Sequence, residues 1–164
     1  MQAEYTRAEF MQIVKLLASN MDKYTGKIAY AANKNLRRAK EELEDIEAER
    51  KPTQEYIAYN KARIELCKKL AKRKNGEPVI ENDQFVFKDD KQADIELAVL
   101  AKTNEAVIKA QQAQLEAFDK ALEDKVTIEW YELAYDEKAI ENLNGSALYP
   151  IMEFFAAAPV LEKK

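Results

Sequence analysis

Apolar residues recur at intervals of three and four over most of the chain, which is the spacing of amphipathic helices. The first predicted helix begins near Thr6, because Thr6-Arg7-Ala8-Glu9 has the capping-box pattern of a helix start. Its apolar face then continues from Phe10 to Met21. A second helix is predicted from about Ile28 to Lys51, with one narrow apolar stripe among charged residues. A stripe of this width favours coiled-coil-like packing against another helix.

Pro52 interrupts the helical pattern, because proline lacks an amide hydrogen and clashes with the preceding turn. A kink and a break that starts a new helix are both open at this position. The next helix is predicted to end near Lys74, before the stop signal Asn75-Gly76. The longest helix is predicted from about Asp90 to Glu123.

Two short stretches have β patterns. Apolar triplets on either side of a polar four-residue loop predict a hairpin over 78–87, and the alternation over 126–133 predicts a strand. We expect this strand to lie beside the hairpin, since an isolated hairpin is only marginally stable. A short acidic helix over 136–143 and a last helical turn or two over 146–157 follow, and 160–164 are expected to fray.

These elements predict a mainly α (α+β) fold, in which a long antiparallel helical hairpin or bundle carries a small antiparallel β-sheet. The length of 164 residues fits a single domain covering 1–164, with 75–89 as a β-hairpin insertion. Polar Asn104 and Gln111 fall on the apolar seam of the longest helix, where polar residues lower stability but fix register.

The composition narrows the chemistry of the chain. It contains no histidine, which removes Ser-His and Cys-His nucleophilic sites and histidine-based zinc sites. A single cysteine, Cys67, allows no internal disulfide and is expected to fill a small core position. No glycine-rich phosphate loop or calcium-loop spacing is found. We therefore expect a protein that is not an enzyme and that needs no cofactor or metal, although a site built from carboxylates or tyrosines stays open.

Charge is unevenly distributed along the chain. Residues 1–76 hold 17 Lys and Arg against 11 Asp and Glu, whereas 77–164 hold 9 against 19. The densest basic run contains five cations, Lys68, Lys69, Lys72, Arg73 and Lys74. These cations suit contact with nucleic-acid phosphates, but they also suit a solvated helix end. Because the chain is acidic overall, with a pI of about 5.2, direct nucleic-acid binding is not expected.

An acidic and aromatic stretch follows the predicted strand 126–133. Its candidate partner-binding residues are Glu129, Trp130, Glu132, Tyr135 and Glu137. Acidic side chains with aromatic anchors suit docking onto a basic protein surface. The alternative is a solvated face with Trp130 in the core.

The two ends of the sequence bear on location and assembly. The first residues lack a signal-peptide pattern, and no stretch approaches the ~20 apolar residues of a membrane span, so we expect a cytoplasmic protein. Residues 149–158 are apolar and suit either the core or a contact with a partner, which leaves self-association open.

Short motifs along the chain resemble an uncharacterised family of small bacteriophage proteins, a domain of unknown function. They are Thr6 to Phe10, Gly26-Lys27, Lys34 to Arg38, Glu41 to Glu44, Gly76-Glu77-Pro78 and Val126 to Glu129. The resemblance implies phage origin, an accessory role in the host cytoplasm and no catalytic residues.

Two functional hypotheses follow. In the first, the chain is a non-enzymatic phage-type protein that inhibits a host defence nuclease, in the manner of an anti-CRISPR protein, by occluding a basic groove. In the second, it is a virion or tail assembly component, such as a scaffold or structural protein. The partner would be the host nuclease in the first case and a virion protein in the second.

Overall fold

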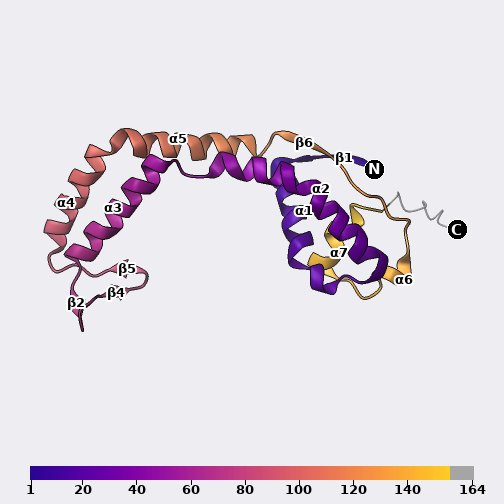
Figure 1. Ribbon diagram of the computed structural model, residues 1–164, viewed down its shortest axis with the longest axis horizontal. Helices are drawn as coiled ribbons and strands as arrows, with labels where there is room; N and C mark the ends of the chain where they lie inside the picture. The colour runs from indigo at the N-terminus through magenta and orange to yellow at the C-terminus, as the bar shows by residue number, and fades with distance from the viewer. Residues whose placement is uncertain (156–164) are drawn as a thin grey trace. The chain divides into compact units, whose positions relative to one another are not determined.

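The computed structural model describes residues 1–155, and it divides the chain into two compact units (Figure 1). The first unit joins Met1–Glu49 to the part of the chain from Phe118 onward, and the second is Arg50–Ala117. The sequence pattern predicts one domain, whereas each of these units has its own internal contacts. The expected frayed tail, 160–164, lies outside the described residues.

The first unit begins with a strand that leads directly into a helix. Strand β1 (Gln2–Thr6) ends at Thr6, which also caps α1 (Arg7–Ser19). The Thr6 hydroxyl accepts the amide hydrogen of Glu9, and the Glu9 carboxylate accepts the amide hydrogen of Thr6 at 2.8 Å. The predicted capping box is therefore confirmed. The hydrogen bonds that the Glu9 carboxylate accepts from the Thr6 amide and the Thr6 hydroxyl hold the pKa of Glu9 below its ordinary value.

Strand β1 pairs antiparallel with β6 (Lys125–Glu129), with Tyr5 opposite Val126 and Ala3 opposite Ile128 (Figure 1). Our expectation that the strand within 126–133 would lie beside the hairpin is wrong. Residues 2–6 carry only a weak strand pattern, because Ala3 and Tyr5 are the only apolar positions on their inner face. Pairing with β6 satisfies backbone groups of both segments and completes the sheet.

Helices cover this small sheet. The first unit contains a 3-10 turn η1 (Met21–Lys23), α2 (Gly26–Arg50), α6 (Glu137–Ile140) and α7 (Gly145–Met152). Helix α7 packs against α1. The core is centred on the largest fully buried side chains of the described chain, among them Trp130, Phe10, Phe154, Leu17 and Ile46. The Trp130 ring lies 5.1 Å from the Phe154 ring and 6.3 Å from the Phe10 ring, between centroids.

The second unit is built on helices that end at sequence signals. Helix α3 (Gln54–Leu70) starts after Pro52, with Thr53 as its N-cap. Of the two possibilities left open at Pro52, the structure therefore has a break between two helices and not a kink within one. The single helix predicted from about Asp90 to Glu123 is instead α4 (Asp90–Thr103) and α5 (Glu105–Ala121). Helix α4 ends at Asn104, where φ is −111° and ψ is 19°, and the side-chain amide of Asn104 joins its backbone amide in donating to the carbonyl of Leu100.

Between α3 and α4 the chain forms two hairpins and not one. Strands β2 (Arg73–Lys74) and β3 (Glu77–Pro78) flank Asn75-Gly76, and β4 (Ile80–Glu81) and β5 (Gln84–Phe85) flank Asn82-Asp83. The predicted hairpin over 78–87 is therefore confirmed in its β4–β5 part. All four turn residues have positive φ, between 49° and 86°, as a two-residue type I′ turn requires.

Three backbone hydrogen bonds join the hairpins at positions seven residues apart. Lys72 donates to Val86 at 2.7 Å, Val86 donates to Val79 at 3.0 Å, and Val79 donates to Lys72 at 2.8 Å. This closed triangle fixes the base of both hairpins.

Among the described residues, no helix is both long and apolar enough to cross a bilayer.

Candidate functional site

The acidic segment, which we define as residues 129–141, follows β6 in the first unit. Its first two side chains differ in exposure, since Glu129 is exposed and Trp130 is only 1% exposed. The indole of Trp130 is therefore unavailable to a partner, and its assignment as a contact residue is wrong. Trp130 is buried because the in-and-out alternation of side chains along β6 continues one residue past the strand, which turns the indole into the core.

The other candidate residues of the acidic segment lie at the surface. Glu129, Glu132 and Glu137 are exposed, and Tyr135 is 39% exposed. Glu132 lies 3.8 Å from the N-terminal amine, and the Tyr135 ring packs edge-on against the buried Phe155 ring at 5.4 Å. Asp136 caps α6 by accepting two backbone amide hydrogens. The segment is thus tied to the core at several points while its carboxylates face solvent.

A buried polar chain lies behind this segment. The Trp130 indole donates to the Tyr5 hydroxyl at 3.0 Å, and that hydroxyl donates to a Glu153 carboxylate oxygen at 2.7 Å. Burial and the hydrogen bond to Glu153 raise the pKa of Tyr5 well above its ordinary range. The network connects the end of β6 with β1 and with the chain after α7.

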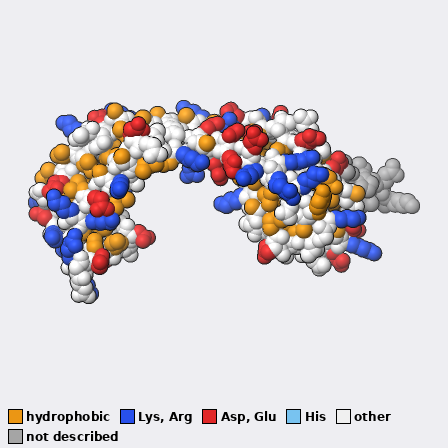
Figure 2. All heavy atoms as spheres, viewed as in Figure 1, with side chains coloured by type: hydrophobic (Ala, Val, Ile, Leu, Met, Phe, Trp, Pro, Cys, Tyr) orange, Lys and Arg blue, Asp and Glu red, His pale blue; other side chains and the backbone are white. Residues whose placement is uncertain are grey.

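A second surface, which we call the cationic cleft, lies on α2. It has a volume of about 330 Å³ and is lined by Tyr30, Lys34, Arg37 and Arg38. In Figure 2, Lys and Arg side chains gather over the part of the molecule where Figure 1 shows α2. The Lys34 ammonium lies 4.0 Å from the centre of the Tyr131 ring and 5.8 Å from that of Tyr30.

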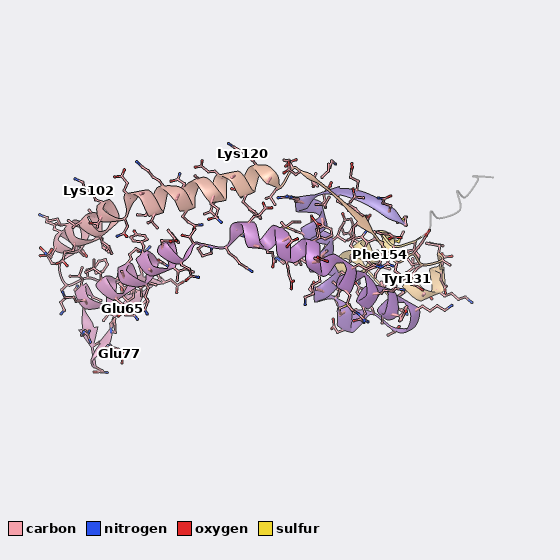
Figure 3. All side chains as sticks on the ribbon, turned by 45° about the horizontal axis from the view of Figure 1, so that its top comes forward. Glu65, Glu77, Lys102, Lys120, Tyr131 and Phe154 are labelled. Atoms are coloured by element: carbon pink, nitrogen blue, oxygen red, sulfur yellow. The ribbon has the colours of Figure 1, made fainter. Side chains whose placement is uncertain are left out.

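Buried Asn35 holds Tyr131, in the segment after β6, against the cationic cleft. Its amide oxygen accepts the backbone hydrogen of Tyr131 at 2.6 Å, and its amide nitrogen donates to the Tyr131 carbonyl at 3.1 Å. Arg38 donates to the carbonyl of Glu129 at 2.8 Å. These bonds hold the Tyr131 backbone against α2, and Figure 3 shows Tyr131 beside this helix.

Sequence reasoning missed the cationic cleft, although a signal exists. Tyr30, Lys34, Arg37 and Arg38 follow the i, i+4, i+7, i+8 spacing of one helix face. The contribution of Tyr131 has no such signal, because it depends on how the chain after β6 returns to α2.

The basic run is divided between two kinds of element. Lys68 and Lys69 lie in the last turn of α3, whereas Arg73 and Lys74 form β2 and Lys72 joins the two. Lys68 pairs with Glu65 at 2.8 Å, which lowers the pKa of that carboxyl, and Arg73 donates to the Gly76 carbonyl. All five cations are exposed, and they do not lie along one face of a helix. Figure 3 marks the two elements that carry most of them, with Glu65 on α3 and Glu77 in the hairpins.

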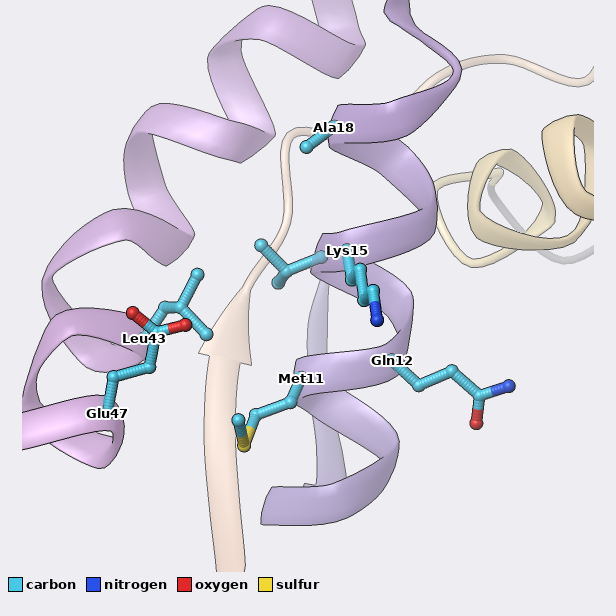
Figure 4. Close-up of a pocket in the computed structure, with 7 residues that line it drawn as sticks. Met11, Gln12, Lys15, Ala18, Leu43 and Glu47 are labelled. Atoms are coloured by element: carbon cyan, nitrogen blue, oxygen red, sulfur yellow. The ribbon is translucent and has the colours of Figure 1, made fainter. Parts of the chain in front are cut away.

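A groove of about 400 Å³ lies between α1 and α2 (Figure 4). It is lined by Met11, Gln12, Val14, Lys15, Ala18, Leu43 and Glu47. Its apolar floor continues the core of the first unit, against which Met11 and Leu43 pack.

Within residues 1–155, no group of three or more Asp, Glu, Cys and His side chains is arranged to hold a metal ion.

Comparison of the chain with protein-family models, with curated proteins and with solved structures gives no match.

Proposed function

We propose that this chain is a non-enzymatic binding protein that docks onto a basic surface of another protein through its acidic segment. The observation that carries the proposal is the exposure of Glu129, Glu132 and Glu137 on a stretch tied to the core by Trp130. A surface that is already ordered loses little entropy on binding, and its charge speeds encounter with a basic partner.

The most specific form of this proposal is inhibition of a nuclease. A nuclease channel is basic because it holds phosphates, so a rigid acidic segment can occupy it and exclude the substrate. Exposed Tyr135 would supply the apolar contact in the middle of the carboxylates. Phage origin, which the resemblance implies, and a host defence nuclease as the target, which the acidic and aromatic stretch favours, are hypotheses within this proposal.

Capture from a bacterial host lysate tests the proposal. The bait is the full chain, and the variant carries Glu129→Lys, Glu132→Lys and Glu137→Lys. A matched control changes the charge equally at three exposed acids elsewhere, Asp45→Lys, Asp94→Lys and Asp119→Lys. We expect the wild-type chain and the control to retain the same basic protein and the first variant to lose it. Equal capture by all three proteins would contradict the proposal, provided that circular dichroism shows all three to be folded.

A second candidate function, an assembly component, is favoured by one feature of the second unit. Ile95 and Val99 lie one turn apart on α4 and are each 61% exposed. Burial of such a pair in a contact between copies is worth about 2–4 kcal/mol. Light scattering separates the two functions, because assembly requires a defined oligomer that Val99→Glu dissociates, whereas the docking proposal is compatible with a monomer.

A further inference from the structure

We propose that the cationic cleft of α2 is a nucleotide-binding site, in which Arg37 and Arg38 hold a phosphate and the open ring of Tyr30 stacks on the base. This site borders the acidic segment and shares Tyr131 with it, but it uses the cations of α2 and not the carboxylates, so neither proposal requires the other. The ligand chemistry is a phosphate beside a planar base, which a free nucleotide and a nucleotide within a single strand both supply.

The cations of the cleft have no carboxylate partner among the described residues. The chain has more acidic than basic residues, yet among residues 1–155 no carboxylate lies within ion-pair distance of Lys34, Arg37 or Arg38. One turn farther along the same helix, Lys40 does pair with Glu44. Arg38 uses one donor on the Glu129 carbonyl, and a guanidinium carries five. Three cations on one face thus have donors left for an anion.

Two tyrosine rings at the cationic cleft offer a surface on which a base can stack. The Tyr30 and Tyr131 rings meet edge to face, with centroids 5.7 Å apart and an interplanar angle of 81°. Lys34 occupies a face of Tyr131, while Tyr30 remains 58% exposed. An exposed tyrosine ring beside arginines is the arrangement on which bases stack, with the backbone phosphate held by the cations. An acidic peptide would use the cations but would leave this ring without a stacking partner.

Hydrogen bonds within the chain hold the aromatic wall of the cationic cleft in place. Asn35 is fully buried, and both of its amide atoms are used to hold the backbone of Tyr131. Most buried polar side chains in proteins are hydrogen-bonded, and the partner of Asn35 is the segment that carries the aromatic wall of the cleft. The volume of about 330 Å³ falls at the lower end of the range for small-ligand sites.

The test is a titration of the full chain with three probes: adenosine monophosphate, a fluorescein-labelled oligothymidylate of ten residues and poly-glutamate. The variants are Arg37→Gln and Tyr30→Ala. The controls are Lys40→Gln on the same helix and Lys72→Gln with Arg73→Gln in the basic run. Arg37 makes no hydrogen bond within residues 1–155, so its removal leaves the fold intact, and circular dichroism checks this for every variant.

We expect nucleotide or oligonucleotide binding that weakens about tenfold in Arg37→Gln, as loss of one charge-assisted hydrogen bond predicts, and that weakens in Tyr30→Ala. Both sets of control variants should bind like wild type. Tight binding of the monophosphate assigns the site to free nucleotides, and binding of the oligomer alone assigns it to single strands. The proposal is overturned by binding of poly-glutamate alone, by no binding, or by an equal loss in Lys40→Gln or in the basic-run variant.

Discussion

At the residue scale, a few buried polar side chains decide where the charged surfaces lie. Asn35 is 0% exposed and makes two hydrogen bonds to the backbone of Tyr131, while the Trp130 indole donates to the Tyr5 hydroxyl. Each of these bonds joins segments that are about a hundred residues apart in sequence. Loss of one partner therefore leaves a buried group unpaired at the base of a surface.

Asn35→Ala is predicted to lower the free energy of unfolding by about 2 kcal/mol, because it leaves an amide hydrogen and a carbonyl of Tyr131 without partners. Asn33→Ala is the matched control, since Asn33 is exposed on the same helix and only bonds to the carbonyl of Ala29. Urea denaturation followed by tryptophan fluorescence measures both. Similar losses in the two variants would contradict the assigned role of Asn35.

Tyr24 gives a prediction for alkaline pH. Burial raises the pKa of its hydroxyl from 10.0 to about 12, and this hydroxyl donates to the Ala147 carbonyl at 2.9 Å. Because the folded pKa lies above the unfolded value, the folded state favours the neutral phenol. This contribution is complete below pH 10 and is lost as the pH rises toward about 12.

We therefore expect the free energy of unfolding to fall between pH 10 and about 12, and to fall less steeply in Tyr24→Phe. Tyr24→Phe should itself cost about 1 kcal/mol at neutral pH, from the lost hydrogen bond. Denaturant titrations across this range give both values. An unchanged pH dependence in Tyr24→Phe would show that Tyr24 does not titrate as described.

At the element scale, the paired type I′ turns are the clearest feature of the second unit. Asn75-Gly76 and Asn82-Asp83 repeat after seven residues, as do Lys72, Val79 and Val86 in the hydrogen-bonded triangle. Only one of the four turn residues is glycine, so the second turn holds two residues with side chains at positive φ. The second turn is therefore the less favourable of the two.

Opposite substitutions in the two turns test this difference. Gly76→Ala should destabilise the hairpins by about 1 kcal/mol through backbone strain alone, since no atom lies within 4 Å of the added methyl group. Asp83→Gly should stabilise them by about 0.5 kcal/mol, because glycine adopts φ of 62° without strain. Amide hydrogen exchange at Lys72, Val79 and Val86 reports both changes. Slower exchange in Gly76→Ala would contradict the turn assignment.

Local signals in the sequence are sufficient to predict most of the helices and the β4–β5 hairpin. The capping box at Thr6, the break at Pro52 and the turn residues each act on neighbouring residues only. The pairing of β1 with β6 depends on residues more than a hundred positions apart, and the stop of α4 at Asn104 is a local change of backbone angles that the helical pattern of the sequence does not show. The exposure of the acidic segment followed from its charges, whereas Tyr131 in the cationic cleft could not be placed without the fold.

At the scale of the whole molecule, the two units differ in how much core they contain. The buried apolar cluster around Trp130 draws all its fully buried members from the first unit. In the second unit the buried residues are Cys67, Ala71, Ala93 and Gln111, and within residues 1–155 the Gln111 side-chain oxygen has no hydrogen-bond partner. The surfaces assigned to binding both lie on the unit with the larger core, which suits presentation of a fixed arrangement of charges.

The proposed docking surface requires Trp130 to be the buried support of the acidic segment and not part of its surface. Because Trp130 is the only tryptophan in the chain, acrylamide quenching of its fluorescence measures this directly. We predict a blue-shifted emission with little quenching in the native protein, and strong quenching once the chain is unfolded in urea. Quenching of the native protein as efficient as that of the unfolded chain would contradict the account.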